Sequence, residues 1–137
     1  ARNIWEKALG PNHPNVGIPV HNLAGLYRDQ GKYAESEALF KRSLAIWEKA
    51  LGADHPNVAK SLNGLALLYD KQGRNTEAEL FFKRALAIRE KALGWEHPEV
   101  AAVCENMAKF YRKIGKPEKA SELERRARRI RSSHRTG

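Results

Sequence analysis

Apolar residues recur at helical spacing in two neighbouring segments of the chain. Between residues 56 and 72 they fall mostly three or four positions apart, which is typical of one buried helix face. A second stripe follows from about Asn75 to Leu93, and no segment keeps the period of two that a strand requires. The first stripe consists of Val58, Leu62, Leu65, Ala66, Leu68 and Tyr69, the second of Ala78, Phe81, Phe82, Ala85, Leu86, Ile88 and Ala92.

The residues that flank the two stripes predict where each helix begins and ends. His55-Pro56 opens the first, because proline in the first turn lacks only an N–H that would be unpaired anyway. Gln72-Gly73 ends it, since glycine readily adopts the left-handed conformation that closes a helix. Gly94 ends the second helix in the same way.

This pair of helices recurs every 42 residues. About 23 of the 42 positions from Gly10 to Leu51 are identical to those from Gly52 to Leu93, and about 14 persist in the next copy. Neither helix can bury its apolar stripe alone, so stacking of neighbouring pairs must bury it. We therefore predict an all-α fold, a right-handed solenoid of about three antiparallel helix pairs.

The register of the repeat divides the chain into one array of successive units. We expect residues 10–51, 52–93 and 94–131 to be three repeats, with a capping helix in the third and a frayed tail at 132–137. Residues 1–9 match the end of a second helix, because Ile4 to Leu9 resembles Ile46 to Leu51. The chain is therefore expected to start inside a unit.

One segment conflicts with the helical pattern. Gly17 and Pro19 fall where the other copies have Ala59 and Ser61. A proline that far inside a helix removes a hydrogen bond and crowds the preceding turn. We expect the first helix of this unit to start late, near Pro19, or to be kinked there.

Composition fits a folded, soluble protein, with 42% hydrophobic and 30% charged residues. No apolar run approaches the roughly 18 residues of a membrane span, and residues 1–9 do not resemble a secretory signal. The single cysteine, Cys104, excludes an internal disulfide framework and fits a reducing compartment. We expect a cytoplasmic location.

Several short segments of the repeat resemble the tetratricopeptide repeats of kinesin light chains and their bacterial relatives. They are Leu65-Ala66-Leu67-Leu68-Tyr69, Glu77-Ala78-Glu79, Phe82-Lys83-Arg84-Ala85-Leu86-Ala87-Ile88, Glu90-Lys91-Ala92-Leu93-Gly94 and His97-Pro98. The ordinary tetratricopeptide unit has 34 residues, whereas the light-chain type shares the longer period found here. The resemblance implies a scaffold whose first helices line a concave groove for a peptide or partner protein.

The open face of the first helices supplies the candidate binding residues that this resemblance implies. Light-chain grooves that bind acidic peptides use asparagines for the peptide backbone and Lys or Arg for its acids, and a carboxamide can both donate and accept hydrogen bonds. Gly64 and Glu105 depart from that pattern. The candidates are His21, Asn22, Arg28, Lys60, Asn63, Leu67, Lys71, Asn106, Lys109, Arg112 and Lys113.

Catalytic and metal-binding chemistry find little support in the sequence. Cys104 occupies the apolar position of Val20 and Leu62, which favours a packed thiol, and no residue is spaced to form a relay with His21. Histidines one repeat apart lie on the order of 10 Å from each other, whereas metal ligands converge within about 2 Å. We predict no enzymatic activity, no cofactor, no metal and no small-molecule substrate.

The positive charge is concentrated at the C-terminal end. Residues 116–137 contribute +5 of the net +9. Arg128 and Arg129 replace Leu86 and Ala87, as expected of a capping helix whose outer face packs on nothing. Two alternatives to partner binding stay open: self-association through the array ends, and, less favoured, nucleic-acid binding through Lys116 to Arg135.

Overall fold

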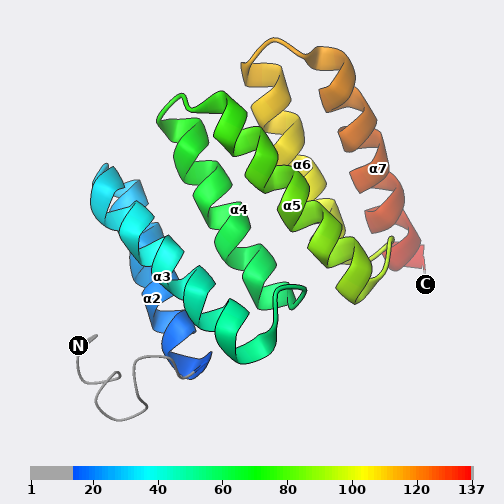
Figure 1. Ribbon diagram of the computed structural model, residues 1–137. Coiled ribbons are helices and arrows are strands. Elements are labelled where there is room, and N and C mark those ends of the chain that lie inside the picture. Colours follow the sequence, from blue (N-terminus) through cyan, green and yellow to red (C-terminus); the bar gives the residue numbers. More distant parts are fainter. Residues whose placement is uncertain (1–13, 137) are drawn as a thin grey trace.

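The computed structural model describes residues 14–136, which form six α-helices and no strand (Figure 1). Successive helices pair antiparallel, and the pairs stack along one axis, which confirms the all-α array expected from the repeat. Residues 1–9 and His13, for which we predicted the end of an earlier repeat and a helix start, lie outside the described residues. The helices are α2 (Pro14–Asp29), α3 (Tyr33–Leu51), α4 (Pro56–Lys71), α5 (Asn75–Leu93), α6 (Pro98–Lys113) and α7 (Pro117–Thr136).

Histidine and glycine fix the helix ends. His55 caps α4 because its Nδ1 accepts a hydrogen bond from the backbone N–H of Asn57 at 3.0 Å, and His97 caps α6 in the same way. Glycines follow the helices with positive φ, such as 75° at Gly73 and 99° at Gly94. The predicted His-Pro helix starts are confirmed for these two repeats, and α5 has the predicted bounds.

Interlocking side chains fill the core between successive pairs. The buried Phe40 of α3 packs over Gly64 of α4, where an added Cβ would collide with the ring. At the next boundary the rings of Phe82 and Phe110 lie 5.5 Å apart. Ala92 is exposed, so its predicted place in the buried stripe was wrong. It lies in the last turn of α5, beyond the contact with its neighbours.

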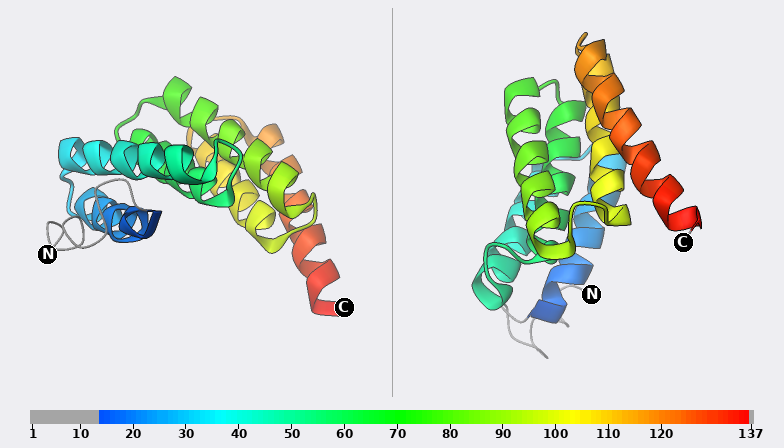
Figure 2. Two further views of the ribbon diagram at one scale, coloured as in Figure 1. Left: turned by 60° about the horizontal axis from the view of Figure 1, so that its bottom comes forward. Right: turned by 90° about the vertical axis from the view of Figure 1, so that its right-hand side faces the viewer.

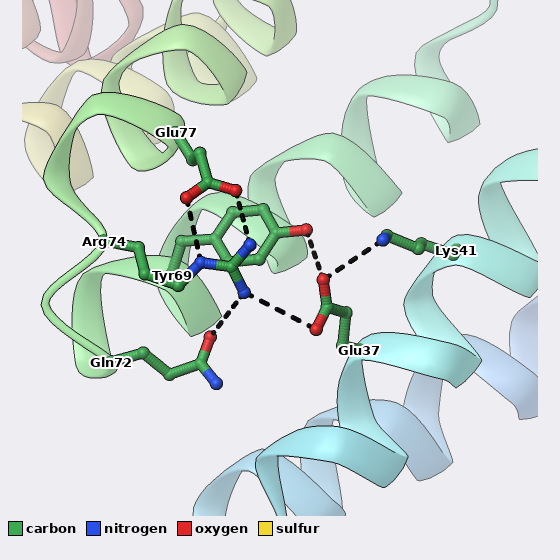
Figure 3. A network of polar contacts seen from close by, with 6 residues as sticks. All are labelled: Glu37, Lys41, Tyr69, Gln72, Arg74 and Glu77. Carbon is green, nitrogen blue, oxygen red and sulfur yellow. Dashed lines mark hydrogen bonds and ion pairs between the residues drawn. The ribbon is translucent and has the colours of Figure 1, made fainter.

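A hydrogen bond between tyrosine and glutamate joins neighbouring repeats at both boundaries. The hydroxyl of Tyr69 on α4 donates to Oε2 of Glu37 on α3 at 2.7 Å, and Tyr111 donates to Glu79 over the same distance. The guanidinium of Arg74 stacks on the Tyr69 ring, 4.2 Å from its centroid, and also contacts Glu37 (Figure 3). The polar contacts thus recur with the period of the sequence.

A second recurring contact connects the second helices of the pairs. Arg84 donates to Oε2 of Glu48 at 3.0 Å, and one repeat later Arg126 lies 2.6 Å from Oε2 of Glu90. The Arg126 guanidinium also lies 3.6 Å from the centre of the Trp95 ring, where the preceding repeat has only Ala53. The α5–α7 contact is therefore more shielded from water than its equivalent between α3 and α5.

The late helix start expected near Pro19 is wrong. Helix α2 begins at Pro14 and runs without interruption through Pro19. Val16 and Val20 are fully buried, and this packing offsets the roughly 3 kcal/mol that an internal proline costs. Gly17 allows α2 to pack closely against Trp47 of α3, because a side chain at residue 17 would collide with the indole.

The last helix is longer than the repeat suggested. Helix α7 continues past residue 131 to Thr136, through most of the segment expected to be frayed. Serine and arginine tolerate the helical conformation in that segment, and Ile130 still anchors it in the core. No helix in the described range has the length and apolar character needed to cross a bilayer.

Candidate functional site

The stacked pairs form an arc with two chemically different sides. In the left view of Figure 2, α3 and α5 lie on the outer side of the arc and α2 and α6 on its inner side. We call the exposed side of α2, α4 and α6 the inner surface. All the candidate residues come from these three helices, so the inner surface is where the predicted site is examined.

The candidates differ in how far solvent reaches them. Gly64, placed on the open face by helical spacing, is buried under Phe40, so the spacing was misleading there. It failed because α4 packs between two neighbours and has a wider buried face than α2. Asn22, Lys60, Lys71, Lys109, Arg112 and Lys113 are exposed, and His21, Arg28, Asn63, Leu67 and Asn106 are half-buried.

Three of the candidate cations already have carboxylate partners. Arg112 makes a bidentate contact with Glu124, with donor–acceptor distances of 2.9 and 2.6 Å. Lys113 lies 3.3 Å from Asp70, and Arg28 lies 3.4 Å from its neighbour Asp29. Among the described residues, Lys60, Lys71 and Lys109 form no ion pair. These three lysines give the inner surface its uncompensated positive charge.

His21 is a packed ring and carries no charge at neutral pH. Its ring lies 5.3 Å from that of Phe40 and 5.8 Å from that of Trp47. Burial, followed by the charges of Lys60, Arg28 and Arg89, lowers the pKa of His21 to about 4. A histidine held neutral by apolar packing suits the floor of a binding surface better than proton transfer.

In the first and third pairs, one position of the second helix contacts the first helix of its own pair. In the first pair it is Trp47, whose ring packs on His21. In the third pair it is Arg131, which donates to both oxygens of Glu105 at 2.7 and 2.8 Å. His21 and Glu105 are equivalent in the repeat, as are Trp47 and Arg131. The third repeat therefore satisfies this position internally, whereas in the first repeat Nδ1 of His21 is buried without a hydrogen-bond partner among the described residues.

The middle repeat places Arg89 and Asn63 at the same two positions. Arg89 is only 7% exposed, and burial lowers its pKa. Its closest carboxylate, that of Glu99, is 3.7 Å from Nε, and the Glu99 carbonyl is 3.5 Å from a terminal nitrogen. Within the described residues, Arg89 Nε and Asn63 Oδ1 are buried without a hydrogen-bond partner.

A buried guanidinium whose Nε has no hydrogen-bond partner and whose one hydrogen bond, to the Glu99 carbonyl, is long at 3.5 Å is only weakly held. Buried polar groups almost always have partners, and a buried charge without a close counter-charge is destabilising. The charge of Arg89 is also the smallest of the causes that lower the pKa of His21 on α2, after burial and the charges of Lys60 and Arg28. A guanidinium offers hydrogen-bond donors to an anionic group, and a carboxamide such as that of Asn63 can both donate and accept.

Arg89 is not among the residues predicted from the sequence. The second helices were expected to form the core, and all predicted polar candidates lie on the first helices. The available signal was an arginine within the buried stripe of α5, directly after Ile88, at the position of Trp47. The first repeat buries an aromatic ring at this position. A charged residue at the same position of the middle repeat indicates that a polar group binds there.

Other reactive groups are enclosed. Cys104 is fully buried, and burial raises the pKa of its thiol, which keeps it protonated. Among the side chains that the structure describes, residues 16–133, no three from His, Cys, Asp or Glu come together in a way that could hold a metal ion. The described His-Pro pairs serve as helix starts, as described above.

Comparison with known proteins agrees with this architecture. A family model described as tetratricopeptide repeat matches residues 18–91. Nephrocystin-3 of Xenopus laevis is 42% identical over 40 residues, which is 29% of this chain and 3% of that protein. The same figures hold for nephrocystin-3 of Xenopus tropicalis.

Solved structures extend the likeness to almost the whole chain. BtubC (BKLC) from P. vanneervenii superposes with a TM-score of 0.86 at 25% identity, over 97% of this chain and 53% of its own. A putative kinesin light chain from Podosopora anserina with nearly identical TPR-like repeats gives a TM-score of 0.77 at 30% identity, over 99% of this chain and 64% of its own. The chain thus spans about half to two thirds of these structures and a small part of nephrocystin-3.

Proposed function

The chain belongs to the tetratricopeptide repeat family, and on that premise we propose that its inner surface binds an extended segment of a partner protein. The residues that we assign to this binding are the eleven candidates of α2, α4 and α6, together with Arg89 of α5. The scaffold itself performs no catalysis, takes no cofactor and acts in the cytoplasm.

Arg89 is the observation that carries this proposal. A guanidinium that is 7% exposed, with its nearest carboxylate 3.7 Å away, gains more from a carboxylate ligand than an exposed lysine does. Asn63 adds an unpartnered carboxamide oxygen, which suits a backbone N–H of an extended chain. Together they favour a segment that carries an acidic side chain or a free C-terminus.

The surrounding lysines support the same choice of partner. Lys60, Lys71 and Lys109 are exposed on the inner surface. Exposed cations of this kind attract acidic segments over a distance of about 8 Å at physiological ionic strength and raise the association rate. We propose that these lysines attract the acidic segment from solution and that Arg89 binds its carboxylate.

A matched pair of variants tests the proposal. A library of capped peptides is screened against the whole chain, and the binders are measured again with Arg89→Met. We expect acidic peptides among the binders and at least a tenfold loss of their affinity, about 1.4 kcal/mol. Arg84→Met is the control, because Arg84 lies on the same helix, is 44% exposed and pairs with Glu48.

The outcome that overturns the proposal is equally specific. Binders whose affinity is insensitive to Arg89→Met, or the absence of any acidic binder, would exclude an anion anchor on the inner surface. Because methionine fills a buried site of this length, loss of folding is not expected, and circular dichroism of the variant checks this.

Self-association through the array ends is the second candidate, and the ends do not complement each other. At one end Ile18 and Leu26 of α2 are 51% and 57% exposed. At the other end α7 presents the exposed Arg125, Arg128 and Arg129. An apolar and a cationic surface do not pair, so we place end-to-end assembly second. Light scattering at increasing concentration tests it through a rise in mass.

Nucleic-acid binding by α7 is weaker still. Arg126 and Arg131 are engaged by Glu90 and Glu105. Among the described residues of this C-terminal segment, the cations without an ion pair are Lys116, Arg125, Arg128 and Arg129, too few for the many phosphate contacts that give tight binding. A salt titration of nucleic-acid binding, repeated with Arg125, Arg128 and Arg129 changed to glutamine, measures any residual affinity.

A further inference from the structure

We propose that Glu105 closes a second anion-binding position in the third repeat, so that a partner's carboxylate is accepted at Arg89 and refused at Arg131. This inference rests on the proposed function, because it concerns the same surface and the same kind of ligand. In this proposal Glu105 determines which repeat binds the carboxylate of the partner.

The repeat supplies both members of the second position. Arg131 follows Arg89 by one period of 42 residues, and Glu105 follows Asn63 by the same period. The third repeat therefore has the arginine of the middle repeat and differs at the position equivalent to Asn63. With asparagine at residue 105, the two repeats would present the same pair of side chains.

Glu105 uses the donors that a ligand would need. Nε of Arg131 donates to one carboxylate oxygen at 2.7 Å, and a terminal nitrogen donates to the other at 2.8 Å. This two-point geometry is the one in which arginine binds carboxylates most strongly. The hydrogen bond from Arg131 also lowers the pKa of Glu105, which keeps the carboxylate ionised near neutral pH.

Competition from within the chain is difficult for a ligand to overcome. A carboxylate on the neighbouring helix acts at a high effective concentration, whereas a partner's carboxylate must first be bound from solution. At Arg89 the internal competitor is much weaker, since the Glu99 carboxylate stays 3.7 Å away and forms no hydrogen bond with Nε. An acidic residue of the partner is thus directed to the middle repeat.

The two side chains can be followed separately by NMR. The whole chain is labelled with ¹⁵N and titrated with capped tetraglutamate as the probe, and the Nε–H signals of Arg89 and Arg131 are recorded. In the unchanged protein we expect the Arg89 signal to move and the Arg131 signal to stay. In Glu105→Asn both signals should move. Glu122→Gln, an exposed position of α7, controls for the lost negative charge.

The results separate this inference from the proposed function. If the Arg89 signal moves but Arg131 remains still in Glu105→Asn, the role of Glu105 is wrong and the function stands. If Arg131 already moves in the unchanged protein, Glu105 does not close the position. If the Arg89 signal never moves, the proposed function fails first. Glu105→Gln, which keeps the side-chain shape, replaces Glu105→Asn should that variant unfold.

Discussion

The hydroxyl of Tyr69 donates a 2.7 Å hydrogen bond to Oε2 of Glu37, across the boundary between the first and second described repeats. The tyrosine comes from the first helix of one pair and the glutamate from the second helix of the pair before. Tyr111 and Glu79 repeat the contact at the next boundary. This hydrogen bond helps to fix how one helix pair is aligned on the next, and both of its residues recur in the following repeat.

Replacing Tyr69 with phenylalanine should weaken the stacking. Loss of a hydrogen bond to a carboxylate is expected to lower the free energy of unfolding by about 1–2 kcal/mol, measured by urea denaturation. Tyr27→Phe is the control, because Tyr27 has the same repeat position but donates to no carboxylate among the described residues. Equal losses in both variants would show that the aromatic ring, and not the hydrogen bond, matters.

Adding a methyl group at two helical glycines should have opposite effects. Gly64→Ala forces a Cβ into the ring of Phe40, and overpacking of this kind costs about 1–3 kcal/mol. Gly25→Ala places its Cβ no closer than 4.0 Å to a neighbouring atom of Arg28, so the better helix propensity should stabilise α2 by about 0.5–1 kcal/mol. Thermal unfolding of the two variants compares them, and stabilisation by Gly64→Ala would contradict the close approach of α3 and α4.

Stability should fall between pH 6.5 and about 4 because of His21. Burial, with Lys60, Arg28 and Arg89, lowers the pKa of His21 to about 4 in the folded protein, from an ordinary 6.5. In this interval the unfolded chain takes up a proton that the folded protein refuses, so acidification favours unfolding. The expected loss is on the order of 3 kcal/mol. Urea denaturation at a series of pH values measures it.

A variant identifies the group responsible for that pH dependence. His21→Asn, which installs the residue found at the equivalent position of α4, should flatten the profile between pH 4 and 6.5. Glu37 and Glu79 have pKa values held low by the tyrosine hydroxyls, and they lose their contribution only as the pH falls below the ordinary range of a carboxyl. A profile that keeps its slope above pH 4.5 in His21→Asn would refute the assignment.

Two ion pairs of the second helices should differ sharply in their importance. Arg126 and Glu90 are 12% and 22% exposed, so Arg126→Gln leaves a half-buried carboxylate unpaired and should cost about 2–3 kcal/mol. Lys91 and Asp54 are 71% and 62% exposed, and Lys91→Gln should leave stability unchanged. Chemical denaturation in low and high salt compares them. Similar losses in the two variants would mean that shielding by Trp95 has no effect.

The array of helix pairs could be predicted from the sequence because the same helix-end residues and apolar stripes recur in successive repeats. The glycines with positive φ and the described His-Pro pairs mark helix ends by local backbone chemistry, which the neighbours do not alter. The start of α2 was misjudged because the internal cost of Pro19 was weighed without the burial of Val16 and Val20. Local rules gave the wrong answer where tertiary packing decides.

The site was only partly predictable for the same reason. Helical spacing correctly assigned exposed residues such as Lys60 to the first helices, but it could not tell that Phe40 covers Gly64. Arg89 was missed because its sequence position belongs to a buried stripe, and only the structure shows a buried guanidinium there whose Nε has no hydrogen-bond partner. Which cations are already neutralised also depends on contacts between distant segments, such as Lys113 with Asp70.

The most direct test of the account is a crystal structure of the whole chain bound to an acidic peptide taken from the screen. We predict a peptide carboxylate within hydrogen-bonding distance of the Arg89 guanidinium, with the peptide extended across α2, α4 and α6. A peptide bound instead to the outer arginines of α7, with Arg89 still beside Glu99 and the inner surface empty, would contradict it.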